Sequence, residues 1–547
     1  MKKMIKITMM VLVMLSLTVS AVFAQADTVI VPTMIDGNPL GAINNFILGD
    51  TTSGGERNNI DRVYKLERDS IYFLNGTLSA NFPLHLIADK PDESHRPPII
   101  AQGVLPDGKS LVVFVQCLDD ATFKNIYFQT SQPTGVGESI ITVQQLKNDG
   151  KYLYDGVYFE WGLWLTIGTW ATNTKTTIQN CYFRNVENAT SEWNGRGISF
   201  QNKDQDTVIM VNNTFFNVNS FFLQGQRNLM KYVKFEHNTM VNSIKWPIQW
   251  EWQVDADFNH NLFYNVHSMG EFPKDKIGQD IDGQAFGIFN MELLPKKYTD
   301  TLGYPEAERK VNLRNNNWYY SSEVTDYWAS IDSLEGEPFM NERTQGMFDD
   351  DNAYPNLIEE STMNLDPGFA NAGDPAVMVQ WIKDLRDTSK ETTYWGFDPD
   401  NDRFGITWPL PEDLSYTNAT LLTAADGFPV GDLNWFPDKK EEWITGVEVD
   451  NNNLVNKFEL AQNYPNPFNP STTINYTIPK NTNVAISIYN AIGQKVVTLV
   501  NKKQAAGSYS VNWNGKDSFN KTLSSGIYFY QLNAGDFIQA RKMILLK

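Results

Sequence analysis

A short pattern that recurs along the middle of the chain constrains its fold more than any other feature. Each copy places Asn, or once Gly, directly before a run of mostly aromatic and branched residues. The copies are Lys124–Phe128, Asp155–Phe159, Gln179–Phe183, Asn212–Phe216, His237–Val241, His260–Tyr264 and Asn315–Tyr319. Measured on the second residue of each copy, the spacings are 31, 24, 33, 25, 23 and 55 residues. Repeats of about 20–50 residues with no helical pattern between them predict short strands stacked coil upon coil, a β-solenoid.

The Asn position predicts how successive coils are joined. Asn tolerates the tight backbone of a bend, and its side chain can bond the Asn one coil away. We therefore expect an Asn ladder along the stack, with Gly156 forming the same bend without the ladder bond. The last spacing predicts either one more coil or a long loop around residues 269–305. A β-propeller is disfavoured because its repeats run to about 40 residues with four strands each.

This rhythm of coils resembles the right-handed parallel β-helix of the pectin-lyase-like superfamily. The resemblance rests on the repeat and not on a catalytic motif, and it implies a parallel β-helix over residues 25–375. Residues 376–449 are acidic and punctuated by Pro, and we expect them to cap the open end of the cylinder. Residues 450–457 read as a polar linker.

The N-terminus reads as a secretory signal peptide over residues 1–24. Lys2, Lys3 and Lys6 precede an apolar run from Met9 to Val19, and Ala24 follows as a cleavage position. The apolar run is well short of the roughly 20 residues that a spanning helix needs, so no membrane span is expected.

Residues 458–547 have a different composition, basic and rich in Asn, Thr and Ser. Strand-like alternation at Val484, Ile486 and Ile488 precedes a turn at Gly493 and predicts a small immunoglobulin-like antiparallel sandwich. The whole chain is thus expected to be all-β, a right-handed parallel β-helix followed by this sandwich.

Three motifs in the last domain follow one another in a specific order: Asn463–Pro470, Tyr489–Lys495 and Ser525–Tyr528. They resemble the type A C-terminal sorting domain of type IX secretion. In that family the domain is a sorting signal that is recognised by the secretion machinery and is commonly removed after export. The resemblance implies a location at the outer-membrane surface or in the medium of a Gram-negative bacterium, after passage through the periplasm. An immunoglobulin-like accessory module that stays attached is the alternative.

Charge and cysteine content exclude some classes of function. The chain carries a formal net charge of −19, and residues 25–457 alone carry −28 because the two ends are basic. Because residues 25–457 are so acidic, they repel phosphate backbones, and nucleic acid is not expected as a partner. The two cysteines, Cys117 and Cys181, exclude a disulfide framework, and we expect buried thiols while a single bridge stays open.

The second strand of each coil supplies candidate binding residues. Its outward positions are Ser199, Gln201, Gln224, Gln226, Gln249, Glu251 and Gln253. Amide groups in such a stripe can bond sugar hydroxyls, so an extracellular polysaccharide is the expected partner. The alternative is a solvated stripe of stacked glutamines. Trp164 and Trp193 are the expected aromatic contacts, because alternation turns Trp250 and Trp252 inward.

A catalytic alternative rests on charged residues beside this stripe. A polysaccharide lyase needs a basic group and often Ca²⁺, and Arg196, Arg227 and Lys245 flank the stripe. Glu251, Arg196 and Arg227 are therefore the catalytic candidates of a lyase or, with less support, a hydrolase. Because the sequence shows none of the local signatures expected of pectate lyases or polygalacturonases, a noncatalytic binding or surface role is favoured.

Metal sites have weak support in the sequence. Asp398, Asp400 and Asp402 resemble the start of a Ca²⁺ loop, but Arg403 stands where Gly should follow. His237 and His260 each precede a repeat Asn and read as stacked turn residues. Ca²⁺ is left open as a cofactor.

Overall fold

The computed structural model describes residues 27–105, 108–131, 140–225, 227–272, 286–399 and 405–444, and most of residues 459–546. Contacts divide the chain into two units. The first comprises Met1–Ala424 with Pro429–Pro437, and the second comprises Ala425–Phe428 with Asp438–Lys547. Each unit has its own hydrophobic core.

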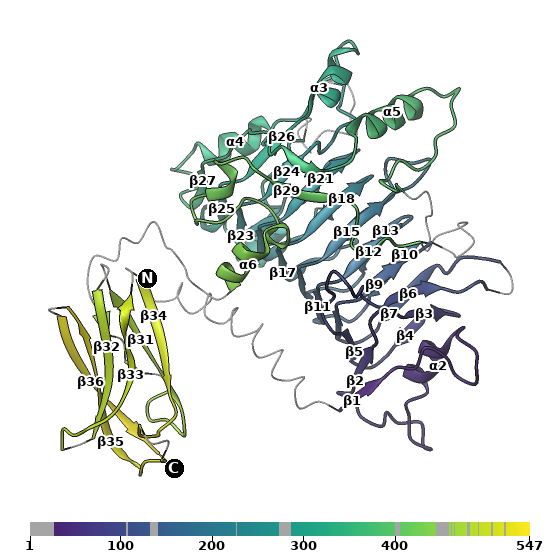
Figure 1. Cartoon of the computed structure of the whole chain (residues 1–547). Helices are drawn as coiled ribbons and strands as arrows, with labels where there is room; N and C mark the ends of the chain where they lie inside the picture. Colours follow the sequence, from purple (N-terminus) through teal and green to yellow (C-terminus); the bar gives the residue numbers. More distant parts are fainter. Residues whose placement is uncertain are drawn as a thin grey trace. The chain divides into compact units, whose positions relative to one another are not determined.

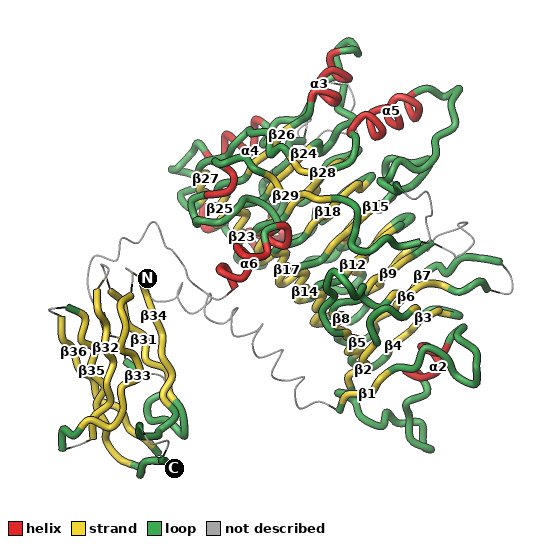
Figure 2. The backbone as a smooth tube through the Cα atoms, in the orientation of Figure 1, coloured by secondary structure: helices red, strands yellow, loops and turns green. Residues whose placement is uncertain are grey.

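The first unit is a parallel solenoid of three sheets (Figures 1 and 2). The eleven-stranded sheet contains β1 (Thr28–Ile30), β2 (Val63–Leu66), β5 (Leu84–Ala88), β8 (Ala121–Lys124), β11 (Lys151–Asp155), β14 (Lys175–Gln179), β17 (Gln205–Val211), β20 (Met230–Glu236), β23 (Gln253–Asn259), β25 (Lys310–Arg314) and β27 (Leu357–Glu360). The nine-stranded sheet contains β3 (Ile71–Leu74), β6 (Ile99–Gln102), β9 (Tyr127–Gln129), β12 (Tyr158–Glu160), β15 (Tyr182–Val186), β18 (Thr214–Val218), β21 (Thr239–Ser243), β24 (Leu262–Tyr264) and β26 (Asn317–Tyr319). The seven-stranded sheet contains β4 (Leu78–Ala80), β7 (Val113–Cys117), β10 (Ile141–Gln145), β13 (Leu165–Thr169), β16 (Arg196–Ser199), β19 (Leu223–Gln224) and β22 (Ile248–Gln249).

Stacked aromatic side chains fill the cylinder. Phe128, Phe159, Phe183 and Phe215 are register neighbours on successive coils, and their ring centroids are 5.5, 4.8 and 4.4 Å apart. All four rings are buried in the main core, as the repeat of aromatic residues requires. The predicted all-β fold class, a parallel solenoid followed by an antiparallel sandwich, is confirmed.

The Asn ladder exists, but the ladder bond and the left-handed bend are made by two adjacent residues and not by the same Asn. Asn213, Asn238, Asn261 and Asn316 are linked by side-chain bonds of 2.9, 3.0 and 3.0 Å. The residue before each of them takes the left-handed bend, for example Asn212 with φ of 54°.

In the first three copies of the repeat the pattern is shifted by one residue. Asn125, Gly156 and Asn180 themselves take the bend, with φ of 55°, 66° and 56°. The ladder position is then apolar, as at Val157 and Cys181, both of which are buried. Aligning the copies on their second residue therefore matched bend residues of the early copies with ladder residues of the later ones, because Asn suits both roles.

The last spacing of 55 residues contains a single coil with a long loop, and not one more coil. The loop joins β24 to β25 over residues 265–309 and is called the excursion here. β23 pairs directly with β25, and β24 pairs directly with β26. The described part of the excursion folds back onto the core through Ile288, Phe289 and Met291.

Short helices close the two ends of the solenoid. Ile43 and Ile47 of α2 (Ala42–Leu48) join the core at the first coils, and Met347 and Phe348 of α4 (Glu342–Phe348) join it at the last. Further along the chain, α3 (Ser322–Ala329) packs against α5 (Pro375–Arg386) through shared apolar residues (Figure 2).

Residues 363–436, here called the strap, lie along the side of the solenoid and not over its end as expected. Their described part contacts the outer face of the nine-stranded sheet from Leu262, through Tyr182, to Tyr127. Within the strap, β28 (Phe369–Asn371) pairs with β29 (Asp413–Tyr416). The reason is that this sheet face carries apolar and aromatic side chains, which need cover along its whole length.

The second unit contains an antiparallel sandwich. One sheet contains β30 (Glu459–Leu460), β31 (Thr472–Ile478) and β34 (Gly507–Trp513), and the other contains β33 (Lys495–Gln504), β32 (Thr482–Asn490), β35 (Gly526–Ala534) and β36 (Phe537–Leu545). A further helix, α6 (Pro437–Ile444), comes before the residues that the sequence predicted as a linker, which lie outside the described residues.

The motif Asn463–Pro470 has a structural role in this sandwich. Asn466 Oδ1 accepts the backbone N–H of Ile544, and Phe468 exchanges backbone bonds with Ile544 and Leu546. These contacts cover the edge of the last strand, β36, that would otherwise be open to pairing with another chain.

Two absences complete the description. No helix among the described residues is long and apolar enough to cross a membrane. Cys117 and Cys181 are both buried and free, and burial raises the pKa of each thiol.

Candidate functional site

The outer face of the seven-stranded sheet carries a ladder of amide side chains. Val115 and Val143 point into the core, so their neighbours Gln116 and Gln144 point outward. Gln116 Nε2 donates to Gln144 Oε1 at 2.8 Å, and Gln116 Oε1 accepts from the Ser79 hydroxyl at 2.8 Å. An amide has two N–H groups and two lone pairs, so each Gln keeps bonding capacity for a ligand.

The ladder continues on the last coils of the same sheet. Ser199 Oγ donates to Gln224 Oε1 at 2.9 Å, and Gln224 Nε2 donates to Gln249 Oε1 at 3.0 Å. Gln201 Nε2 donates to Ser199 Oγ at 2.8 Å. Gln201, Gln224 and Gln249 thus lie together, but Gln224, which was predicted as an outward residue, is only 5% exposed. The predicted residue Gln226 lies outside the described residues.

Two tryptophans interrupt the ladder at its middle. Gly168 occupies the row between Gln144 and Ser199, and a Cβ there would lie 2.4 Å from the Trp170 ring. The rings of Trp170 and Trp164 are 6.3 Å apart at 56°, and both are half-buried. They pack on outward apolar residues of β7, β10 and β13. The face therefore combines amides with an aromatic platform.

Sequence reasoning found Trp164 but missed Trp170, Gln116 and Gln144. The signal for the glutamines was present, since Val115-Gln116 and Val143-Gln144 repeat one coil apart. The signal for Trp170 was not, because only the absence of a side chain at Gly168 lets the ring lie on the sheet.

The three predicted catalytic residues have different surroundings. Arg196 donates to Gln224 Oε1 at 3.0 Å and to the Trp193 carbonyl at 2.8 Å, and burial lowers its pKa. Arg227 pairs with Glu292 at 3.2 Å. Glu251 was expected on the outer face, but it is only 1% exposed.

The cause of that burial also applies to Gln253, which was expected outward and is fully buried. β22 ends at Gln249, and the following chain is covered by the excursion. Arg309 holds this cover in place, because its buried guanidinium donates to the carbonyls of Glu251, Gln253 and Glu292. Strand alternation therefore does not extend past Gln249.

A chain of four titratable groups lies beside Trp193. Lys245 Nζ is 3.1 Å from Glu271, His267 Nε2 is 3.2 Å from the same carboxylate, and His267 Nδ1 is 3.3 Å from Glu337. The Lys245 ammonium lies 4.6 Å from the Trp193 ring centre. Of these residues the sequence singled out only Lys245 and Trp193, because Glu337 arrives from a distant segment.

The pKa values of His267, Glu271 and Glu337 are shifted. Burial by itself lowers the pKa of His267, but bonds to Glu271 and Glu337 outweigh it and raise the pKa above its usual value. Burial raises the pKa of Glu337. Burial also acts to raise that of Glu271, yet His267 and Lys245 bring it down to about 2.

The raised pKa of His267 predicts a pH-dependent stability. Its contribution is complete below the unfolded pKa of about 6.5 and is lost as pH rises through the higher folded value. As the pH rises above about 6.5, we expect the free energy of unfolding to fall more in the wild type than in His267→Gln. Urea unfolding at each pH measures this, and equal pH profiles would contradict it.

The nine-stranded sheet has a buried charge cluster beneath the strap, which the sequence did not reveal. Arg184 pairs with Glu160 and, at 2.9 Å, with Glu412 of the strap. The Glu187 carboxylate accepts the backbone N–H groups of Trp395 and Gly396, both at 2.9 Å. Burial raises the pKa of Glu160 although Arg184 acts against it. The strap thereby occupies this face.

Two of the metal candidates, His237 and His260, lie with Asp426 in a group that could hold a metal ion, because one ligand atom of each lies within 4.8 Å of the others. His237 and His260 stack with ring centres 4.9 Å apart in left-handed bends, as turn residues do. Asp398 is half-buried, while Asp400 and Asp402 lie outside the described residues.

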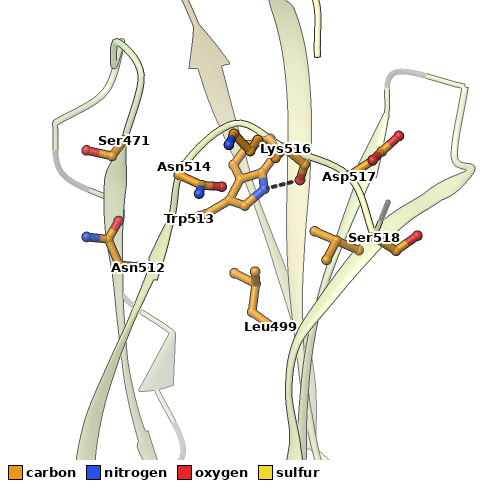
Figure 3. Close-up of a pocket in the computed structure, with 9 residues that line it drawn as sticks. Ser471, Leu499, Asn512, Trp513, Asn514, Lys516, Asp517 and Ser518 are labelled. Atoms are coloured by element: carbon orange, nitrogen blue, oxygen red, sulfur yellow. Dashed lines mark hydrogen bonds between the residues drawn. The ribbon is translucent and has the colours of Figure 1, made fainter. Parts of the chain in front are cut away.

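A cleft of about 490 Å³ lies in the C-terminal sandwich (Figure 3). It follows the seam between Leu499 on β33 and Asn512 on β34. The Trp513 indole beside it is only 2% exposed and donates to the Lys516 carbonyl at 2.9 Å, as the dashed line shows. This ring supports the sandwich and is not a free stacking platform.

Comparison with known proteins identifies a domain at the C-terminus. The model of the FlgD Ig-like domain matches residues 470–536. No curated protein matches the chain. Among solved structures, dimeric latent PorU of Porphyromonas gingivalis is similar with 20% identity and a TM-score of 0.15, covering 16% of this chain and 9% of that one. PorZ of the same organism, a surface component of its type IX secretion system, shows 14% identity and a TM-score of 0.13, covering 17% and 12%. The chain thus matches about a tenth of the length of either structure.

Proposed function

We propose that this protein binds an extracellular polysaccharide on the outer face of the seven-stranded sheet without cleaving it. The supporting observation is the amide ladder interrupted by Trp164 and Trp170. Aromatic faces pack on the apolar faces of sugar rings, and amides on both sides bond their hydroxyls. Exposed Val112 and Ile140 extend the apolar surface at the start of β7 and β10.

The chemistry of the face favours a neutral glycan. Its rows consist of amides, hydroxyls, apolar residues and a single guanidinium, Arg196, which is already bonded to Gln224. A uronide would require cations, and the acidic body repels polyanions. The nine-stranded sheet is covered by the strap, and the eleven-stranded sheet carries ion pairs such as Lys175 with Asp206.

The proposal predicts which variants lose binding. Trp170→Ala is expected to raise the Kd for a recognised neutral polysaccharide about tenfold, because a stacking contact contributes about 1 kcal/mol or more. Gln116→Ala with Gln144→Ala is expected to weaken binding about fivefold. Affinity electrophoresis across a panel of neutral and acidic glycans, with and without Ca²⁺, measures both.

Gln179→Ala is the matched control, since Gln179 lies on the eleven-stranded sheet. Equal retardation of all variants, or retention by acidic glycans alone, would contradict the proposal.

A polysaccharide lyase or hydrolase is the second candidate. The contact of Glu271, His267 and Glu337 favours it, because neighbouring buried groups with shifted pKa values are typical of acid–base sites. Incubation with the same panel would distinguish the candidates: unsaturated uronides indicate a lyase, and new reducing ends alone indicate a hydrolase.

We further propose that residues 1–24 direct export and that the C-terminal domain is a type IX sorting domain, which would place the solenoid at the outer-membrane surface or in the medium. The motif order from Asn463 to Tyr528 supports this address, and the family match supports an immunoglobulin-like fold for it. Deletion of residues 458–547 is the test, and retention of the solenoid inside the cell is the expected result.

A further inference from the structure

The four-stranded sheet of the C-terminal domain carries an ordered row of side chains on its outer face. The pairing register places Lys542, Phe529, Tyr489 and Lys495 side by side across β36, β35, β32 and β33. Tyr530, next to Phe529 on its strand, is buried in the core, so the row faces outward. A basic side chain thus lies at each end of an aromatic pair. We call these four residues the Lys–aromatic row.

The centre of this row is apolar and hollowed. Phe529 is 38% exposed, and Ile527 on the same strand is 45% exposed. Tyr489 and Phe529 line a cleft of about 250 Å³ together with Gln531 and Ala540. Exposed apolar residues grouped on a sheet face, surrounded by polar residues, mark a contact site for a partner.

Charge complementarity indicates what kind of partner fits. Lys495 and Lys542 are both exposed. The neighbouring rows contain no acidic residue; they consist of Ile544 with Ile527, and of Ala540, Gln531, Ser487 and Thr498. Residues 458–547 contain nine basic and three acidic side chains. The face therefore attracts an acidic partner.

The spacing of the lysines sets a second condition. Adjacent strands lie about 4.8 Å apart, so the two lysines are separated by three intervals, about 14 Å at the backbone. An extended peptide advances about 3.3 Å per residue, so carboxylates four residues apart match this span. The residue midway between them points to the same side and reaches the aromatic cleft.

We propose that the Lys–aromatic row docks an acidic protein segment in which two carboxylates flank one apolar side chain. The inference goes beyond the roles proposed above, because this contact requires neither a glycan nor export. A protein segment fits better than an anionic membrane, since Phe529 lines a cleft and bilayer binding needs a broad protruding apolar face.

Synthetic peptides test the inference on the full chain. The probe is a labelled extended peptide, Glu-Ser-Phe-Ser-Glu, and its control has the same composition in the order Glu-Glu-Ser-Phe-Ser. Fluorescence anisotropy should show at least fivefold tighter binding of the probe. Phe529→Ala should weaken binding about tenfold, and Lys495→Glu or Lys542→Glu about fivefold each. Raising the salt concentration should weaken it further.

Lys521→Glu is the matched control, because it removes the same charge from an exposed loop position. The lysine variants change exposed residues, so loss of folding does not obscure the result. Equal binding of the two peptides, or an equal loss with Lys521→Glu, would overturn the proposal. Binding of vesicles of anionic phospholipid, with no peptide binding, would assign the face to a membrane instead.

Discussion

Arg184→Met is expected to lower the free energy of unfolding of the solenoid by about 3–5 kcal/mol at neutral pH. Arg184 is buried between Glu160 and Glu412, and its guanidinium also donates to the Phe397 carbonyl at 2.8 Å. Without it, two carboxylates lie close together in a buried site. Urea unfolding monitored by tryptophan fluorescence measures the loss.

The pH dependence of this loss follows from the carboxylates. Burial already raises the pKa of Glu160 in the wild type, and removal of the guanidinium raises it further. A carboxyl with a raised folded pKa favours the folded state as pH falls, so the deficit should shrink between about pH 7 and 5.

A charge-neutral triple variant, Arg184→Met with Glu160→Gln and Glu412→Gln, provides the control. It should recover most of the lost stability, because the cost comes from uncompensated charge and not from lost packing. If the triple variant were as unstable as the single one, the electrostatic account would be wrong and packing beneath the strap would be the cause.

Asn238→Gly is expected to destabilise the solenoid by about 3–5 kcal/mol. Asn238 is fully buried, donates to the Met210 carbonyl and Asn261 Oδ1 at 3.0 Å each, and accepts from the backbone N–H of Asn213 at 3.1 Å. Its removal leaves several buried polar groups of neighbouring coils without partners. Thermal and urea unfolding give the loss.

Asn180→Gly is the matched substitution at a bend. Asn180 has a φ of 56°, and Gly156 occupies the equivalent position one coil earlier. Glycine adopts this conformation freely, so a loss of only about 1 kcal/mol is expected. Similar losses at the two positions would mean that the ladder bonds do not carry the stability of the stack.

The choice of binding face depends on how the strap lies. Leu414 and Tyr416 of the strap cover Tyr182, Val241 and Leu262 of the nine-stranded sheet. On the outer face of the seven-stranded sheet, Gln224 is buried, whereas the other ladder amides and the two tryptophans are half-buried. Because the strap covers one face of the solenoid, a long ligand would bind on the amide face.

The sequence by itself determined the solenoid, because its coils repeat the same local chemistry. Each coil needs a bend residue and inward aromatic or branched residues, and both recur in the printed sequence from Asn125 to Asn316. The ladder glutamines Gln224 and Gln249 followed from the same periodicity. The bend residue shifts by one position between the early and late copies, but in every copy it lies within the five-residue pattern.

Only the tertiary structure showed the features that depend on contacts between distant parts of the chain. Glu251 and Gln253 are buried because the excursion, fixed by Arg309, folds over the end of β22. Trp170 forms a platform because Gly168 leaves room beneath its ring. Glu412 lies 228 residues from Arg184, and no local pattern relates them. Periodicity encodes contacts between one coil and the next, whereas the fit of a distant segment depends on surfaces that exist only after the coils have stacked.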